Sequence, residues 1–257
     1  LFLGQIDDAD EAYLNGHMIG YQGGFPPDYS TAYSVPRRYT VPKGLLRSAG
    51  ENVLAVRVYD DEIAGGIVHG DLGLFYMRDQ LRVVLDFSGS WRLKIGDDLQ
   101  FAQRDYDDSS WQQVFVPGMW DGYDLKDYDG TGWYRTRFRL PEKLLNEKLI
   151  LVLGKIDDLD EVYLNGKLVG KTGFWSARRG GLEINGDEYN RYRAYFVSPD
   201  MFLPGQENVL AVRVYDAMIH GGIWDGPVGI ATRKEFLSWS EERSPFEEIF
   251  FELFKRQ

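Results

Sequence analysis

Two loops in the second half of the chain combine aromatic and polar side chains in a way that suits carbohydrate. One loop contains Trp175 and Arg178, and the other, AMIHGGIWDGP, contains His220, Trp224 and Asp225. Sugar rings stack on aromatic faces, while carboxylate, amide and arginine groups bind the hydroxyls. Neighbouring segments add three further candidates, Trp120, Tyr123 and Asp216. The alternative is that these aromatic side chains pack their own loops or dock a partner domain.

An acidic cluster at Asp157, Asp158 and Asp160 has a counterpart at Asp7, Asp8 and Asp10. Carboxylate oxygens suit hard cations, so a structural calcium ion is one interpretation, although the spacing does not match an EF-hand loop. The alternative is a turn in which aspartate side chains accept hydrogen bonds from backbone amides before a hairpin strand. Repetition of the cluster favours the structural alternative, and we expect no cofactor.

Catalytic machinery is not evident in the sequence. There is no cysteine and no GxSxG motif, and the three histidines are His17, His69 and His220. A serine esterase needs a nucleophile on a strained turn and a histidine base. A retaining glycosidase needs two carboxylates about 5 Å apart, usually on a barrel, and no alternating β/α pattern is present. The sequence therefore favours an accessory module over an enzyme.

The net charge of the chain limits the classes of partner that it can bind. The formal net charge is −11 and the sequence pI is about 4.8. Binding to nucleic acid requires clustered lysine and arginine, so nucleic acid is disfavoured as a partner, and an anionic membrane surface is disfavoured for the same reason. No segment is apolar over the ~20 residues that a membrane helix needs.

The chain contains a long internal repeat. GQIDDADEAYLNGHMIG at Gly4–Gly20 matches GKIDDLDEVYLNGKLVG at Gly154–Gly170, and ENVLAVRVYD occurs at Glu51–Asp60 and Glu207–Asp216. A GGI triplet follows in each copy, which we interpret as a turn that needs positive φ. The period is too long for a solenoid, so the repeat predicts two tandem domains.

The local pattern within the repeat is that of β-strands. Asn15-Gly16 and Asn165-Gly166 lie between short apolar runs, a strong signal for a type I′ hairpin. ENVLAVRVYD alternates as a core strand does, and we expect its Arg213 and Asp216 to pair with neighbours. In WYRTRFRLP at Trp133–Pro141, the arginines share one face, which is expected to be solvated.

The C-terminus has a helical pattern instead. Ser244, Pro245 and Glu247 form an N-terminal capping signature. Aromatic and aliphatic residues then follow at helical spacing, which predicts an amphipathic helix over Pro245–Arg256. This helix either packs on its own protein or docks a neighbouring domain or subunit.

The order of motifs resembles a known family. SGSW, DDSSWQQVFVPGMW, DGTGWYRTRFRLP, LVLGKIDDLDEVYLNGKLVG and ENVLAVRVYD together resemble the galactose-binding-like sandwich of family 2 glycoside hydrolases, and the IDD-x-D-E and GGI features are also similar to the accessory sandwich of sialate O-acetylesterases. The resemblance implies an all-β fold of two tandem jelly-roll β-sandwiches. The predicted parts are a partial sandwich over 1–80 that is incomplete at its N-terminus, a complete jelly roll over 81–233 and a helical extension over 234–257.

The resemblance also implies a function. In such families the sandwich usually binds carbohydrate or braces a catalytic domain, with no chemistry of its own, and it works outside the cytoplasm. The partners it implies are a carbohydrate and a catalytic domain or second protein chain. Two alternatives remain: a structural scaffold that binds protein through the C-terminal helix, and a part of a glycosidase or esterase whose catalytic domain lies elsewhere.

Overall fold

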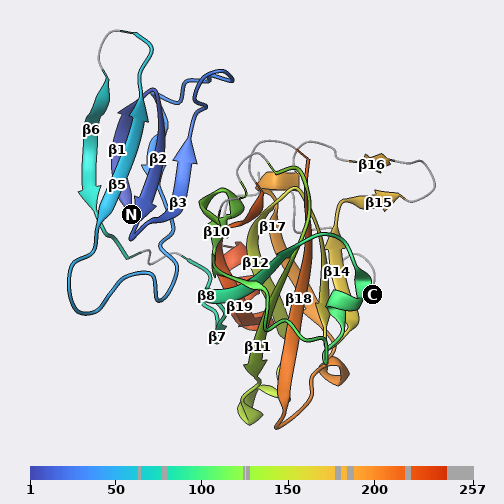
Figure 1. Cartoon of the computed structure of the whole chain (residues 1–257). Coiled ribbons are helices and arrows are strands. Elements are labelled where there is room, and N and C mark those ends of the chain that lie inside the picture. The colour runs from blue at the N-terminus through green and yellow to red at the C-terminus, as the bar shows by residue number, and fades with distance from the viewer. Residues whose placement is uncertain are drawn as a thin grey trace.

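The computed structural model describes residues 1–62, 65–76, 80–123, 125, 128–176, 181–183, 188–217 and 221–241. These residues form antiparallel β-sheets with short 3₁₀ turns and one α-helix, so the predicted all-β class is confirmed. The sheets fall into two groups, which Figure 1 shows as separate bodies. We call β1–β6 the first unit and β7–β19, with the helix, the second unit.

The second unit is a β-sandwich of two main sheets. The six-stranded sheet has the order β14 (Lys167–Thr172), β13 (Leu159–Leu164), β18 (Glu207–Asp216), β11 (Gly130–Arg139), β8 (Gly89–Ile95) and β9 (Gln112–Val116). The five-stranded sheet has the order β10 (Gly118–Met119), β19 (Gly222–Thr232), β12 (Leu149–Asp157) and β17 (Tyr192–Val197), with β7 (Leu85–Asp86) paired to β19. A separate hairpin is made by β15 (Phe174–Ser176) and β16 (Gly181–Glu183). The 3₁₀ turns are η1 (Leu99–Ala102), η2 (Trp120–Tyr123), η3 (Glu142–Leu144), η4 (Glu188–Asn190) and η5 (Pro199–Met201).

The first unit repeats the inner strands of the second. One of its sheets has the order β3 (His17–Gln22), β2 (Ala9–Leu14) and β5 (Leu54–Tyr59), and the other has the order β4 (Pro36–Arg38), β1 (Phe2–Asp7) and β6 (Gly66–Gly73). By sequence these correspond to β14-β13-β18 and β17-β12-β19. Among the described residues, the first unit has no strands in the places that β7 to β11 take in the second.

The Asn-Gly hairpins form as predicted. Asn15 and Asn165 have φ values of 51° and 52°, and the glycines that follow have φ values of 85° and 82°. Two successive residues with positive φ define the type I′ turn that joins β2 to β3 and β13 to β14.

The second GGI triplet makes room for a core tryptophan. A Cβ atom on Gly221 would lie 1.5 Å from the Trp120 ring, so a side chain is excluded there. The next glycine, Gly222, has a φ of 131°, in line with the turn interpretation. Trp120 is only 1% exposed and belongs to the main core of the second unit.

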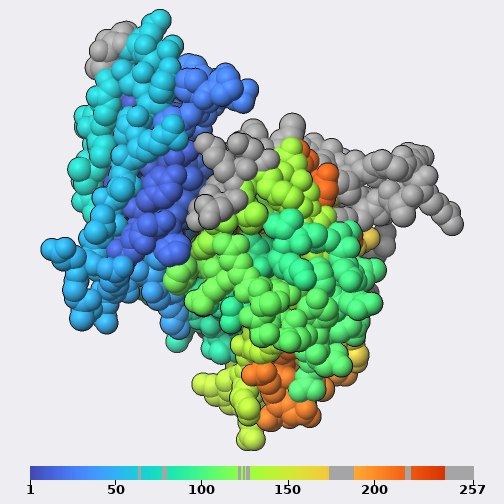
Figure 2. All heavy atoms as spheres, viewed as in Figure 1, coloured from blue at the N-terminus to red at the C-terminus, as the bar shows by residue number. Residues whose placement is uncertain are grey.

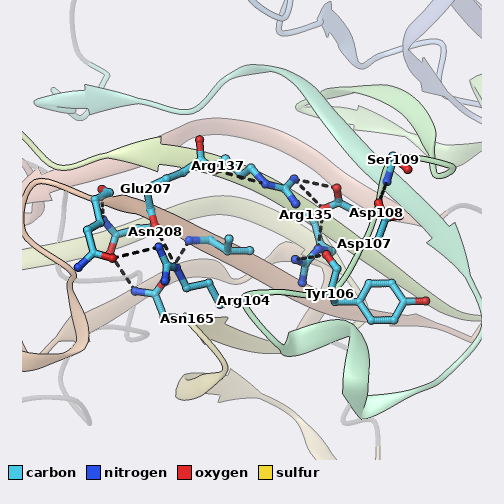
Figure 3. Close-up of polar contacts among 12 residues, drawn as sticks. Arg104, Tyr106, Asp107, Asp108, Ser109, Arg135, Arg137, Asn165, Glu207 and Asn208 are labelled. Carbon is cyan, nitrogen blue, oxygen red and sulfur yellow. Dashed lines mark hydrogen bonds and ion pairs between the residues drawn. The ribbon is translucent and has the colours of Figure 1, made fainter.

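The expectation of a solvated arginine face on β11 is wrong for Arg135, which is fully buried. Its Nε donates to Asp108 at 2.7 Å (Figure 3). Its other nitrogens donate to the backbone carbonyls of Phe101 in η1 and of Gln103 and Tyr106 after it. Arg137 donates two further hydrogen bonds to Asp108 at 2.8 Å. The segment from η1 to Asp108 covers this face, which strand alternation alone does not predict.

Helix α1 (Arg233–Glu241) lies at the start of the helical extension predicted over 234–257, but it was not predicted from the sequence as a separate helix. Thr232 Oγ1 accepts a hydrogen bond from the Glu235 amide at 3.2 Å, a capping pair that was not identified from the sequence. Phe236 and Trp239 are buried in an apolar cluster against β12 and β19. The predicted helix Pro245–Arg256 lies outside the described residues. In the part of the chain that is described, no helix has the length and apolar character needed to cross a membrane.

The two units touch along one side of β3, as Figure 2 shows for the blue and green surfaces. The His17 ring lies 5.1 Å from that of Phe115 and 5.8 Å from that of Tyr123. Phe115 also packs against the apolar core of the first unit. Thr40 Oγ1 donates to Asp225 at 2.9 Å, which adds a polar contact to this apolar one.

Candidate functional site

A pocket of about 240 Å³ lies where the two units meet. The first unit contributes the end of β3 and the residues around β4, and the second contributes β10, β12, η4 and β19. The residues of this junction pocket with chemical interest are Arg38, Thr40, Asp157, Tyr189, Trp224 and Asp225. Two of the candidates predicted from sequence, Trp224 and Asp225, are thus brought together here.

Trp224 is held in a fixed orientation. It follows the fully buried Ile223 in β19, so strand alternation turns its side chain away from the core. Its Nε1 donates to the Tyr189 carbonyl at 3.1 Å. The ammonium of Lys155 lies 5.1 Å from the centre of the Trp224 ring, a cation–π distance. The indole therefore lines the pocket without free rotation.

Asp225 belongs to both the pocket and the junction. Its Oδ1 accepts hydrogen bonds from Thr40 Oγ1 at 2.9 Å and from the Gly226 amide at 2.8 Å. The Thr40 bond crosses from one unit to the other. The same carboxylate is thus positioned by backbone, tied to the first unit and presented to the pocket.

A buried arginine fixes the strand that carries Arg38, Tyr39 and Thr40 into the pocket. Arg37 is fully buried, pairs with Asp10 and donates to four backbone carbonyls. Tyr39 donates to the other oxygen of Asp10 at 2.6 Å. Arg38 lies between these two inward-facing residues, so its side chain is on the opposite side of β4, with its guanidinium 5.2 Å from the Phe2 ring centre.

The second unit has the same arrangement, which explains the third aspartate of the repeated motif. Asp160 is fully buried, accepts from Arg193 Nε at 2.7 Å and accepts from the Tyr195 hydroxyl at 2.5 Å. Arg193 also donates to the backbone carbonyls of Ile156 in β12, Asp158 just after β12 and Glu188 in η4. Asp10 and Asp160 therefore serve as structural anchors within their own units.

The first two aspartates of each motif meet a different carboxylate. Oxygens of Asp157, Asp158 and Asp216 lie within 4.8 Å of one another, and Asp7, Asp8 and Asp60 repeat this grouping. Asp158 Oδ2 accepts from the Ala217 amide at 3.1 Å, and Asp8 Oδ2 from the Asp61 amide at 3.0 Å. These bonds match the turn interpretation. Calcium binding stays a prediction: three carboxylates suit a hard cation, but Ca²⁺ takes six to eight oxygen ligands.

Asp157 is an unusual acid within the pocket. Burial, with added effects of a hydrogen bond to Asp158 and the charges of Asp158 and Asp216, raises the pKa of Asp157 to about 9. The raised pKa favours the protonated acid, whose single proton is donated to Asp158. Strongly shifted carboxyl groups in pockets are a recurrent sign of functional sites.

The remaining predicted residues lie elsewhere. Trp120 and Tyr123 are buried, and the Tyr123 hydroxyl accepts from the Phe115 amide at 2.6 Å, so both pack within the protein. Asp216 is fully buried in the acidic grouping. Trp175 lies on β15, which Figure 1 shows on the side of the second unit away from the first. Arg178 and His220 lie outside the described residues.

Sequence reasoning missed Tyr189, Arg38 and Thr40 as pocket residues. Tyr189 belongs to the loop that is six residues longer in the second copy, so loop length was an available signal. Thr40 stands where the second copy has Phe196, a polar-for-aromatic difference between repeats. Their meeting depends on how the units are placed, which no repeat comparison predicts.

Comparison with known proteins supports the expected resemblance. A putative β-glucuronidase of Formosa agariphila is 23% identical over 169 residues, which cover 61% of this chain and 15% of the relative. A β-galactosidase of Vibrio vulnificus is 33% identical over 108 residues, which cover 32% of this chain and 10% of the relative. A solved structure of Bacteroides uniformis β-glucuronidase 2 is 25% identical with a TM-score of 0.46, covering 55% of this chain and 17% of that one. No family model matches the chain.

The two curated relatives support the resemblance to family 2 glycoside hydrolases over part of the chain, 61% of it in one case and 32% in the other. The chain spans about a sixth or less of the length of the curated relatives it matches. The resemblance to sialate O-acetylesterases stays a prediction.

Proposed function

We propose that this chain is a non-catalytic carbohydrate-binding module of a larger carbohydrate-active protein related to family 2 glycoside hydrolases, and that it acts outside the cytoplasm. The observation that carries the proposal is the junction pocket, where Trp224 and Asp225 meet Tyr189 and Arg38. An aromatic surface beside a few fixed polar groups is the usual composition of a sugar site.

Each pocket residue has a distinct part in this proposal. Trp224 offers an oriented ring for the CH face of a sugar, with the indole held by its bond to the Tyr189 carbonyl. Asp225 accepts a hydrogen bond from a sugar hydroxyl. Arg38 suits a hydroxyl or a sugar carboxylate. With one ring and few hydrogen bonds, affinity for one sugar unit is expected to be about millimolar.

A glycan array followed by ligand-observed NMR tests this proposal. Trp224→Ala should weaken binding about three- to tenfold, because an aromatic contact is worth about 0.5–1.5 kcal/mol beyond area burial. The matched control is Val68→Ala, since Val68 occupies the corresponding exposed position in the first copy. Circular dichroism establishes that both variants fold. Equal loss in both variants, or no binding by the parent, contradicts the proposal.

Bracing of a catalytic domain is the second candidate function. It is favoured by the contact between the units, in which His17, Phe115 and Tyr123 form an aromatic group that joins them. Under this function the two units act as a spacer of defined angle, and no glycan binds the pocket. Small-angle scattering on His17→Ala, which should change the angle between the units without unfolding either one, tests it.

A further inference from the structure

The same ten residues form a strand in each unit, so the chain carries its own comparison. ENVLAVRVYD spans 51–60 around β5 and 207–216 in β18. Both strands are fixed at one end by an asparagine pair. Asn15 donates to Asn52 at 2.8 Å, and Asn165 donates to Asn208 at the same distance (Figure 3). The two strands therefore have the same sequence and the same anchor.

Their environments are opposite. Val209 and Leu210 in β18 are 2% and 1% exposed, whereas Val53 and Leu54 are 58% and 42% exposed. Because the side chains are identical, the difference comes only from what covers them. Apolar surface left in water costs roughly 25 cal/mol per Å², so these residues favour a covering partner.

Strand pairing identifies the missing cover. β18 pairs with β13 on one side and with β11 on the other. The pairing with β11 runs over all ten residues, from Gly130 opposite Asp216 to Arg139 opposite Glu207. Within the described part of the chain, β5 pairs with β2 alone. The carbonyls of Val53 and Tyr59 accept bonds from the β2 side. By alternation, the N–H and C=O groups of Leu54, Val56 and Val58 face the open edge.

The apolar face beside this edge is uncovered too. In the second unit, Val228 and Ile230 of β19 are buried in the core that β8, β9 and β11 help to form. Their counterparts in the first unit, Leu72 and Leu74, are exposed. Other large apolar side chains exposed on β6 and the residues that follow it are Ile67, Val68, Phe75 and Tyr76.

We infer that the open edge of β5 binds an antiparallel β-strand with the side-chain pattern of β11, supplied by a polypeptide segment outside this sequence. β11 alternates an aromatic residue or threonine on one face with an arginine on the opposite face, and Tyr134 stands opposite Val212. The same register places an aromatic side chain opposite Val56. A second copy of this chain does not supply the strand, because its β11 already pairs with β8 and β18.

A peptide with the sequence of residues 129–141 is a direct probe. We expect the labelled peptide to bind the full chain saturably in fluorescence polarisation, and to slow amide hydrogen exchange at Leu54, Val56 and Val58. Val56→Pro removes one open-edge amide and leaves the β2 ladder intact, so it should weaken binding at least tenfold. Leu54→Lys places a charge at the open edge and is the second variant, in case proline disturbs folding. A peptide of scrambled order is the matched ligand control.

Four outcomes overturn the inference. They are no saturable binding up to millimolar peptide, equal binding of the scrambled peptide, unchanged binding to both folded variants, and protection from exchange on β18 instead of β5. Sedimentation velocity addresses the occupant: a dimer of the parent chain that Val56→Pro dissociates would assign the edge to a second copy and contradict the occupant named here.

Discussion

Asp157 gives a quantitative prediction about stability and pH. Its carboxyl pKa is raised from 3.8 to about 9, chiefly by burial and secondarily by Asp158 and Asp216. The folded chain therefore keeps a proton that the unfolded chain releases above about pH 4. The stabilisation from this group is fully present below pH 3.8 and is lost as the pH rises toward 9. Asp157→Asn replaces the protonated acid with a neutral side chain of the same shape and should remove this pH dependence.

The size of the effect follows from linkage. Each pH unit between the unfolded and folded pKa values changes the free energy of unfolding by about 1.4 kcal/mol. From pH 3.8 to pH 7 the upper limit is about 4 kcal/mol. The amide makes a weaker hydrogen bond to Asp158 than the acid does, which offsets about 1 kcal/mol. We therefore expect Asp157→Asn to be more stable than the parent at pH 7 by about 1–3 kcal/mol.

Urea unfolding at pH 5, 7 and 8.5 measures this directly. All seven tryptophans lie at residue 91 or later, so tryptophan fluorescence reports chiefly the second unit. Asp200→Asn is the control, because the pKa of Asp200 is shifted in the opposite direction: a hydrogen bond from the Ser198 hydroxyl lowers it. An Asp157→Asn variant that is less stable than the parent at pH 7, with the same slope against pH, would refute the reasoning.

Three further substitutions probe the second unit by urea unfolding. Arg193→Met leaves the buried Asp160 charge unpaired and should cost about 3–5 kcal/mol, seen as a lower urea midpoint; an unchanged midpoint would contradict the anchoring role. Gly221→Ala places a Cβ into the Trp120 ring and should cost about 3 kcal/mol together with a change in fluorescence spectrum; wild-type stability would show that the contact relaxes freely. Thr232→Ala removes the cap of α1 and should cost about 1 kcal/mol, with Thr232→Ser expected to recover it.

Local sequence patterns predicted the strands well because they depend on nearest neighbours. The strand expected over Glu207–Asp216 is β18 with the same bounds, and both Asn-Gly turns have the predicted positive φ values. Arg213 pairs with Asp97 and Glu161, as expected of a core strand whose charges meet neighbours. Periodicity and turn chemistry are sufficient for such features.

Features that depend on contacts between distant segments could not be predicted from the sequence. The burial of Arg135 depends on Asp108 and on the Phe101 carbonyl in η1, which lie 27 and 34 residues away in the chain. The pocket depends on Thr40 reaching Asp225, across 185 positions. Trp224 and Asp225 were predictable as candidates from residue type, but their grouping with Arg38 required the placement of the two units.

The Thr40–Asp225 bond makes the junction pocket a shared property of both units. One wall belongs to each unit, so the width of the pocket varies with the angle between them. A ligand that prefers one width must favour one angle, and by thermodynamic reciprocity any contact that fixes the angle changes the ligand's affinity by the same factor. The affinity of a ligand for this pocket and the angle between the two units are therefore coupled quantities.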